Sequence, residues 1–249
     1  MSDILQKTNI KIRNVLLLNE LDKIDRILDR ENIEAGVIKG CSMILNNIYD
    51  IDEREMSDVD LIVKKDDYKK VVNILYQLGF KKIKKGRNSF YKEIGKKFAP
   101  IIFDIHYEFL GIKYLDIDFK YCGYKKIKSA SPSDELIITA SHSIVKHSFF
   151  GDRERKDFLR IYQKGIFNKN FIKDVFRKAK TKKLSYIIWL CFKKCNIFTE
   201  FPDVSLKEIL SIPFVNICFY KHFKINEYIL PFFYDIELVK NKFYNGFLV

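Results

Sequence analysis

Arg54–Val63 reads REMSDVDLIV, and its second half has the apolar composition of a strand that enters a hydrophobic core. Two aspartates, Asp58 and Asp60, stand one residue apart where this strand begins. Carboxylates this close repel each other, and burying them adds a desolvation cost. Because side chains two residues apart in an extended chain point to the same face, both carboxylates can aim at one bound cation.

The segments around this strand predict a mixed α/β fold for the first half of the chain. Apolar positions recur at helical or alternating spacing, and turn residues separate the segments. In chain order we expect a helix over Ile12–Ile33, a strand in AGVIKG that ends at Gly40, a helix over CSMILNNIY, the strand VDLIV, a helix over KKDDYKKVVNILYQLGF, and strands in NSFYKEI and PIIFDIHYEF. Asp66 is the expected N-cap of the third helix, and Gly79 is its expected stop.

The pattern changes near residue 130 and is helical from there almost to the end. SASPSDELIITASHSIVKH reads as a helix start, with Ser133 as the expected N-cap and acidic residues behind it that suit the positive end of a helix. We therefore expect the class α+β, with a small mixed sheet flanked by helices in residues 1–130 and a mostly helical domain in residues 131–249. Three prolines interrupt the later helical pattern: Pro202, Pro213 and Pro231.

A third aspartate, Asp104, lies in IIFDIHY on another expected strand, between apolar neighbours. Three converging carboxylates need a cation, and Mg²⁺ fits because it prefers hard oxygen ligands and phosphate oxygens. Two such ions, about 3.5–4 Å apart, commonly serve an in-line displacement at phosphorus. The alternative for DVD alone is that these aspartates cap a turn or face water, and Asp58 can also pair with Arg54 at the surface.

Composition indicates a folded chain with a basic surface. The 249 residues are 47% hydrophobic and 31% charged, and the net charge of +13 attracts polyanions such as nucleotides, nucleic acid or an acidic protein. The N-terminus has no signal-peptide pattern, and no apolar run is long enough for a membrane span, so we expect a cytoplasmic protein with no membrane partner. The five cysteines form no CxxC pair, which argues against a zinc knuckle or a disulfide framework: Cys41, Cys122, Cys191, Cys195 and Cys218.

The order of these motifs resembles a known family. IKGCSMIL, REMSDVDLIV, LGF, IIFDIHYEF and ASHSIVKH follow one another as in the uncharacterised nucleotidyltransferases of the DNA polymerase β-like superfamily. The likeness covers Gly36 to His147, and MSDVDLIV placed after the KG pair is a fairly specific part of it. The resemblance implies that Asp58 and Asp60 are the metal-binding pair. It implies that Asp104, the third carboxylate, helps to activate the incoming hydroxyl and shares a second metal ion.

The resemblance also places a phosphate-facing glycine at Gly40, between a strand and a helix. A tight turn there lets backbone N–H groups approach a phosphate closely. The superfamily commonly continues with serine or glycine, whereas this chain continues with Cys41 and has Ser42 one place later. A cysteine still offers its N–H, so a phosphate cradle of Gly40, Cys41 and Ser42 is retained, but the usual hydroxyl is displaced.

Other candidate nucleotide-binding residues flank these motifs. Lys39, directly before the glycine, and Arg54 can contact a triphosphate, with a solvated charge as the alternative for each. His106 shares the face of Asp104 and can touch substrate or relay a proton, with a hydrogen-bonded core histidine as the alternative. His142 and His147 are five residues apart, which fits a helical metal pair poorly, so we expect no zinc site there.

We therefore expect a metal-dependent nucleotidyltransferase that uses Mg²⁺ or Mn²⁺ to move NMP from an NTP, such as ATP, to a hydroxyl acceptor. Pyrophosphate leaves, and RNA, a protein and a small molecule are the candidate acceptors. Family likeness alone adds a toxin–antitoxin-type protein partner as a candidate. The alternative is a catalytically inactive module that binds a nucleotide or a partner on the same fold. An RNA-binding protein driven by the positive charge is a third hypothesis, which no RNP-type or KH-type motif supports.

Overall fold

The computed structural model describes residues 2–84, 88–95, 98–146, 150–166 and 170–197, all within one compact unit of residues 1–205. The helices are α1 (Ser2–Arg30), α2 (Lys39–Leu45), α3 (Tyr68–Gln77), α4 (Pro132–Ser141), α5 (Asp152–Gly165), α6 (Phe171–Thr181) and α7 (Ser185–Lys194). The strands are β1 (Ala35–Ile38), β2 (Val59–Val63), β3 (Lys81–Lys82), β4 (Ser89–Lys92), β5 (Ile101–His106), β6 (Glu108–Phe109), β7 (Ile112–Lys113), β8 (Phe119–Tyr121) and β9 (Ile127–Ala130). Short 3-10 turns cover Lys65–Asp67 and Tyr114–Asp116, and a π-helical turn covers His142–Lys146.

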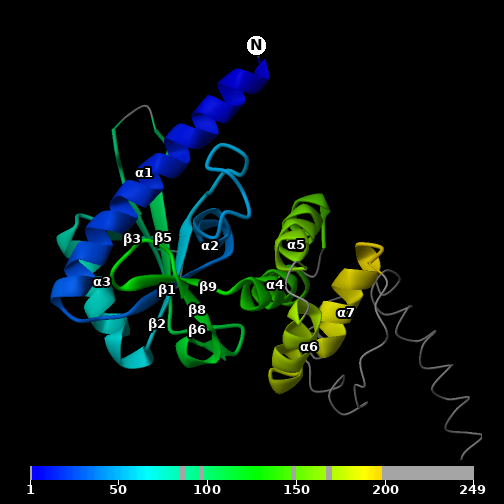
Figure 1. The fold of residues 1–249 in the computed structure, drawn as a ribbon. Helices are drawn as coiled ribbons and strands as arrows, with labels where there is room; N and C mark the ends of the chain where they lie inside the picture. Colours follow the sequence, from blue (N-terminus) through cyan, green and yellow to red (C-terminus); the bar gives the residue numbers. More distant parts are fainter. Residues whose placement is uncertain (1, 85–87, 96–97, 147–149, 167–169, 198–249) are drawn as a thin grey trace, which may run out of the picture. The chain divides into compact units, whose positions relative to one another are not determined.

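The sheet mixes parallel and antiparallel pairs. Seven strands among the described residues run in the order β3-β4-β5-β2-β1-β9-β8, while β6 and β7 form a separate hairpin. β1 is antiparallel to β2 and parallel to β9, and β2 is parallel to β5. The expected α+β class is confirmed: a mixed sheet is flanked by helices and followed by a helical region (Figure 1).

Helices cover both faces of the central strands. Every residue of β1 and β2 is buried, which explains why AGVI and VDLIV read as continuous apolar runs. α1 and α3 contact each other and β5 on one face, where Phe103 packs edge-on against Phe80 at 5.3 Å between ring centroids. α2 packs on β1, β2 and β9 from the other side (Figure 1).

Strand alternation selects the residues that face the α2 side. Phe103 of β5 points toward α3, so Asp104 points the opposite way, and His106 shares its face. Asp60 of β2 is the register partner of Asp104 in the parallel β2–β5 pair. Two acidic residues from distant parts of the chain therefore meet on the face that α2 covers.

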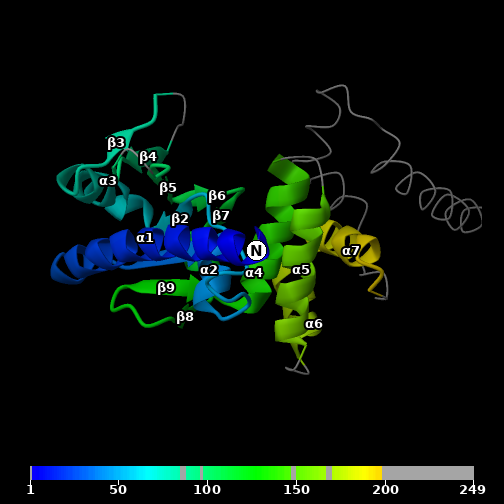
Figure 2. The ribbon, with the colours of Figure 1, turned by 90° about the horizontal axis from the view of Figure 1, so that it is seen from above.

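The later helices gather around α4. α4 contacts α5, α6, α7 and also α2, and Figure 2 shows this group of helices beside the sheet. Lys178 of α6 is buried and forms ion pairs with Asp134 of α4 at 2.7 Å and with Asp118, in the segment before β8, at 2.6 Å. The domain boundary near residue 130 stays a prediction, and Pro202, Pro213 and Pro231 lie outside the described residues.

The expected ends of several helices are wrong. The N-cap of α4 is Ser131, whose Oγ accepts a hydrogen bond from the Asp134 N–H at 3.3 Å, because Pro132 suits the first helical position. Ser133 instead accepts a hydrogen bond from Lys178 Nζ at 3.0 Å. Asp66 lies in the 3-10 turn before α3 and does not cap that helix. α1 begins at Ser2 rather than Ile12, and no helix in the described ranges is long and apolar enough to cross a membrane.

Candidate functional site

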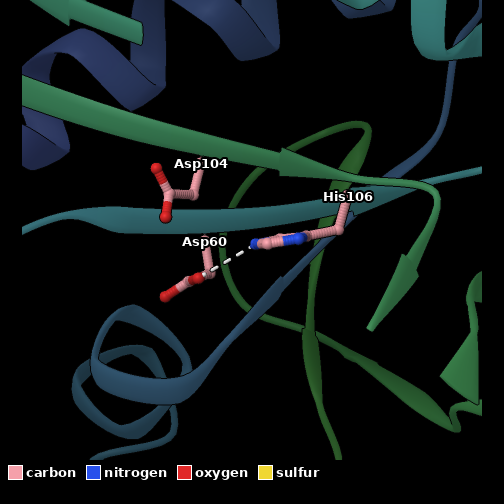
Figure 3. Close-up of side chains that lie close together, drawn as sticks. All are labelled: Asp60, Asp104 and His106. Carbon is pink, nitrogen blue, oxygen red and sulfur yellow. Dashed lines mark hydrogen bonds and ion pairs between the residues drawn. The ribbon is translucent and has the colours of Figure 1, made fainter. Parts of the chain in front are cut away.

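Asp60, Asp104 and His106 gather on one face of the sheet, as Figure 3 shows. Each offers one atom able to bind a metal, and these three atoms lie within 4.8 Å of one another. His106 Nε2 is 3.1 Å from Asp60 Oδ1. The cluster arises from the pairing register of β2 and β5, together with the two-residue spacing of Asp104 and His106.

Asp60 is charged and held by two basic groups. Its side chain is 2% exposed, Lys39 Nζ lies 2.8 Å from Oδ2, and His106 contacts Oδ1. Burial alone would raise the pKa of Asp60, but Lys39 and His106 outweigh it and lower the pKa below its ordinary value. Asp60 is therefore ionised at neutral pH.

Asp104 contributes an unpaired buried atom. Its Oδ1 is buried and has no hydrogen-bond partner among the described residues. A buried carboxylate oxygen without a partner is costly, and native proteins usually give such an oxygen a donor or an ion. Carboxylate oxygens and an imidazole nitrogen are suitable ligands for a divalent cation. The residues of this cluster therefore fit a bound metal ion.

Asp58 lies just before β2 and outside the three-residue cluster. It is half-buried and accepts a hydrogen bond from Ser57 Oγ at 2.8 Å. Burial raises the pKa of Asp58, and the charges of Asp60 and, more weakly, Asp104 raise it further. The three aspartates therefore act on one another electrostatically, and the metal-binding set of Asp58, Asp60 and Asp104 stays a prediction.

The KG pair begins α2. Lys39 has a left-handed backbone, with φ of 59°, and its N–H donates to Glu135 Oε2 at 2.9 Å. The N–H of Lys39, directly before the expected phosphate cradle of Gly40, Cys41 and Ser42, is thus bound to Glu135. Gly40 is buried, and a Cβ on it would lie 2.2 Å from Arg54 Nη1. A close approach of the Arg54 guanidinium, rather than a positive φ, explains the glycine.

Cys41 and Ser42 are buried inside α2. Ser42 Oγ donates to the Ala130 carbonyl of β9 at 3.4 Å and accepts a hydrogen bond from Asn46 Nδ2 at 3.2 Å. Burial raises the pKa of the Cys41 thiol far above its ordinary value, so the thiol stays protonated. The side chains of both residues lie outside the pocket described below, and the Ser42 hydroxyl fastens α2 to the sheet.

Arg54 pairs with Asp157 of α5 rather than with Asp58. Its Nε donates to Oδ1 at 2.9 Å and its Nη2 to Oδ2 at 2.8 Å, which is a two-pronged contact. Both side chains are largely buried, so the pair connects the loop before β2 to the helical region. The sequence GDRERKDFLR favoured a solvated helix start, with an inward-facing Asp157 as the alternative, and Asp157 is buried.

Glu135 of α4 is a site residue that sequence reasoning missed. It is fully buried, accepts hydrogen bonds from the Lys39 N–H and from Thr139 Oγ1 at 3.3 Å, and lies near Arg54. Burial raises the pKa of Glu135 to about 8 despite these hydrogen bonds. Its only sequence signal was its place in an acidic helix start, which is explained equally well by the helix dipole.

A pocket of about 580 Å³ lies beside the aspartates. Lys39, Gly40, Asp58 and Asp60 line it from the sheet side, and Arg54 borders it as well. The opposite wall comes from α4, the π-helical turn and α5, with Thr139, His142, Arg153, Glu154 and Asp157 among its residues. Asp104, His106, Cys41 and Ser42 are not among the residues that line it.

His142 lies in this wall and stacks on Phe109 of β6, with ring centroids 5.6 Å apart. Phe109 also meets the ring of His106 edge-on at 5.2 Å. Phe109 thus separates the two histidines and fixes their orientation. His147 lies outside the described residues, so the expectation that it forms no zinc pair with His142 stays a prediction.

Comparisons with known proteins indicate the family of this chain. The model of a family described as uncharacterised nucleotidyltransferase matches residues 5–198, which include every site residue named above. Among solved structures, the chain is similar to an antigenic nucleotidyltransferase-like protein from Paracoccidioides brasiliensis, with 14% identity and a TM-score of 0.44 over 74% of this chain and 92% of that one. No curated protein matches the chain. Because the family model covers most of its length, the chain belongs to the uncharacterised nucleotidyltransferase family.

Proposed function

We propose that this chain is a metal-dependent nucleotidyltransferase that moves NMP from an NTP to a hydroxyl acceptor and releases pyrophosphate. The observation that carries the proposal is the pairing of Asp60 with Asp104 beside the 580 Å³ pocket, with a buried Asp104 oxygen that lacks a partner in the described part of the chain. Family membership supports the reaction class. ATP is one candidate donor, and the cytoplasm supplies such nucleotides.

Asp58, Asp60 and Asp104 are the residues proposed to hold Mg²⁺ or Mn²⁺, with His106 close enough to contribute a nitrogen. A bound ion would neutralise triphosphate charge and polarise the acceptor hydroxyl. The chain itself supplies fixed carboxylates on two neighbouring strands, which need no rearrangement when substrate arrives. This preorganisation is what the sheet contributes to the reaction.

In the proposed reaction, the acceptor oxygen forms a bond to the α-phosphorus while the bond from that phosphorus to the bridging oxygen breaks. Pyrophosphate leaves with the bond electrons. Asp104, the register partner of Asp60, orients the attacking hydroxyl and accepts its proton. Lys39 and Arg54 line the pocket together with Gly40, so these two cations are the proposed contacts of the triphosphate.

The second candidate is an inactive module that binds a nucleotide or a partner. Lys39 and His106 already occupy both oxygens of Asp60, and the Lys39 N–H is bound to Glu135. A site that satisfies its own charges in this way can hold the fold together without turnover. The retained carboxylate set of Asp58, Asp60 and Asp104 favours the enzyme, and the acceptor of that enzyme is open between RNA, protein and small molecules.

A label-transfer assay tests the proposal. The protein is incubated with each NTP labelled at the α-phosphate, with Mg²⁺ or Mn²⁺, and with RNA, protein and small-molecule extracts as separate acceptors. We expect labelled product and free pyrophosphate with the wild type and none with Asp104→Asn. Metal-dependent nucleotide binding with no transfer in any extract would support the inactive module and reject the enzyme.

A further inference from the structure

Lys39 combines a fixed backbone with a side chain that reaches into the carboxylate cluster. Its left-handed φ of 59° is unusual for a residue with a side chain, and its N–H donates to Oε2 of the buried Glu135 at 2.9 Å. The side chain ends 2.8 Å from Asp60 Oδ2 and 5.4 Å from the centre of the Phe109 ring. An ammonium group thus sits on an oxygen that the proposed metal set requires.

Both oxygens of Asp60 are engaged, one by Lys39 and the other by His106 at 3.1 Å. His106 can stay when a divalent ion enters, because an imidazole that gives up its Nε2 hydrogen offers a lone pair, and because His106 belongs to the cluster that could hold the ion. An ammonium group has three donors and no lone pair, so it can only repel the ion. Lys39 is therefore the group that must leave Asp60.

We propose that Lys39 is the resident counter-cation of Asp60 and exchanges with the divalent ion when the metal–nucleotide complex binds. This inference rests on the proposed function for the identity of the nucleotide. The Lys39 side chain borders the pocket, and its flexible stem can turn from Asp60 to an entering polyphosphate while Glu135 keeps the backbone in place. The incoming phosphates replace the charge partner that Lys39 gives up.

The exchange couples two binding events. Without nucleotide, Lys39 neutralises Asp60 and competes with the ion, so free metal binds weakly. A nucleotide that draws Lys39 away frees Asp60 Oδ2 and strengthens metal binding. By reciprocity, metal strengthens nucleotide binding by the same factor. The site thereby prefers the metal–NTP complex over either component alone.

Mn²⁺ binding measured by electron paramagnetic resonance, without nucleotide, tests the competition directly. We expect Lys39→Met to bind Mn²⁺ roughly tenfold more tightly than wild type, because a largely buried competing charge is removed. Lys39→Arg keeps the charge and should stay near the wild-type affinity. Lys92→Met is the matched control, since Lys92 pairs with Glu20 of α1 at 2.9 Å, outside the site. It should leave Mn²⁺ affinity unchanged.

The coupling is measured by repeating the titration with a nonhydrolysable NTP analogue. Nucleotide should tighten Mn²⁺ binding strongly in wild type and Lys92→Met, and clearly less in Lys39→Met. A merely structural role for Lys39 would not change this ratio. Circular dichroism checks folding, and Lys39→Gln, which can still donate to Asp60, replaces the methionine variant if that variant does not fold.

The possible results separate this inference from the proposed function. Unchanged or weaker Mn²⁺ affinity in the folded, neutral Lys39 variant overturns the exchange, even if wild type transfers label. Mn²⁺ binding that the two control variants preserve and the neutral variant tightens supports the exchange, even if no acceptor is ever labelled. Failure of Mn²⁺ to bind any variant at millimolar concentration also overturns it.

Discussion

Asp58 and Asp60 are two residues apart, yet the protein shifts their acidities in opposite directions. Lys39 and His106 overcome the burial of Asp60 and lower its pKa. Asp58 accepts a hydrogen bond from the Ser57 hydroxyl, and burial and the Asp60 charge raise its pKa more than Lys39 and Ser57 lower it. The repulsion implied by the DVD sequence is therefore relieved at Asp60 and retained at Asp58. A bound cation would relieve it at both.

At the residue scale, we expect Asp58→Asn to abolish label transfer while leaving the fold slightly more stable. A carboxyl whose folded pKa is raised opposes folding once it is ionised, so removing its charge at pH 7 stabilises the folded state. The Tm should rise by about 2 °C, as a gain somewhat below 1 kcal/mol produces in a domain of this size. Differential scanning fluorimetry measures the Tm, with exposed Asp66→Asn as the control. Retained transfer would remove Asp58 from the proposed metal set.

At the residue scale, the raised pKa of Glu135 should also make the free energy of unfolding depend on pH. Its folded pKa is raised to about 8 by burial, from an ordinary value of 4.5, with Arg54 and the Lys39 N–H opposing the shift. The stability that protonated Glu135 contributes is complete below pH 4.5 and is lost as pH rises toward 8. Glu135→Gln should therefore gain stability relative to wild type by about 1 kcal/mol per pH unit between pH 5 and 8. Urea unfolding at several pH values measures this, and a pH-independent difference would contradict it.

The sequence predicts site residues that lie together in one short motif, but not their partners from distant segments. Strand periodicity indicated that Asp104 and His106 share a face, which β5 confirms. No local pattern could indicate that Lys39 would pair with Asp60 or that Glu135 would hold Lys39, because these contacts join residues 21 and 96 positions apart. Such partners are chosen by the packing of α2 against β2 and α4.

At the element scale, three segments meet at one guanidinium. Gly40 of α2 lies against Arg54, and Arg54 is held by Asp157 of α5. The loop before β2 is thereby fixed between a helix of the sheet region and a helix of the later region. The glycine, the arginine and the aspartate act as one unit, so changes to them should not add independently.

We expect Gly40→Ala to lower the free energy of unfolding by about 2 kcal/mol, because the new Cβ forces Arg54 away from its place. Asp157→Asn should cost about 3 kcal/mol, because Arg54 keeps a largely buried charge without a charged partner. The double variant should cost less than the sum, since the alanine already disrupts the pair. Urea unfolding of the four proteins gives the cycle, and strict additivity would show that the two contacts are independent.

Elements with strong periodicity were predictable, whereas short ones were not. VDLIV and IIFDIH are strands as expected, and the helix before Gly79 is α3. The strands β7 to β9 were not expected, because they have two to four residues each and show no clear alternation. The expected strand PIIFDIHYEF is divided into β5 and the short β6. β9 becomes a strand through its parallel pairing with β1, a contact across about ninety residues that local pattern cannot show.

At the scale of the whole molecule, the pocket is lined by residues from both sides of the change in secondary structure near residue 130. Its aspartates and Lys39 come from before that point, and Thr139, His142 and Asp157 come from after it. The chain carries a net charge of +13, whereas the residues that line the pocket carry both signs, so the net charge can attract a polyanion while specific carboxylates and cations bind it. Composition predicts that the chain attracts polyanions, but only the fold determines where a polyanion would bind.

Two fragments of the chain distinguish one folding unit from two independent domains. Residues 1–205 form one compact unit, so we expect a 1–205 fragment to unfold cooperatively and to keep nucleotide-dependent Mn²⁺ binding. A 1–130 fragment loses Glu135, which holds Lys39, and Asp157, which holds Arg54, and it exposes the face of α2 that α4 covers. We expect its Tm to fall by more than about 10 °C, the effect of several kcal/mol in a domain of this size, and its Mn²⁺ coupling to disappear. Circular dichroism melts and the same Mn²⁺ titration decide this. Cooperative melting of 1–130 near the Tm of 1–205 would instead make residue 130 a true folding boundary, with the site assembled between two independent domains.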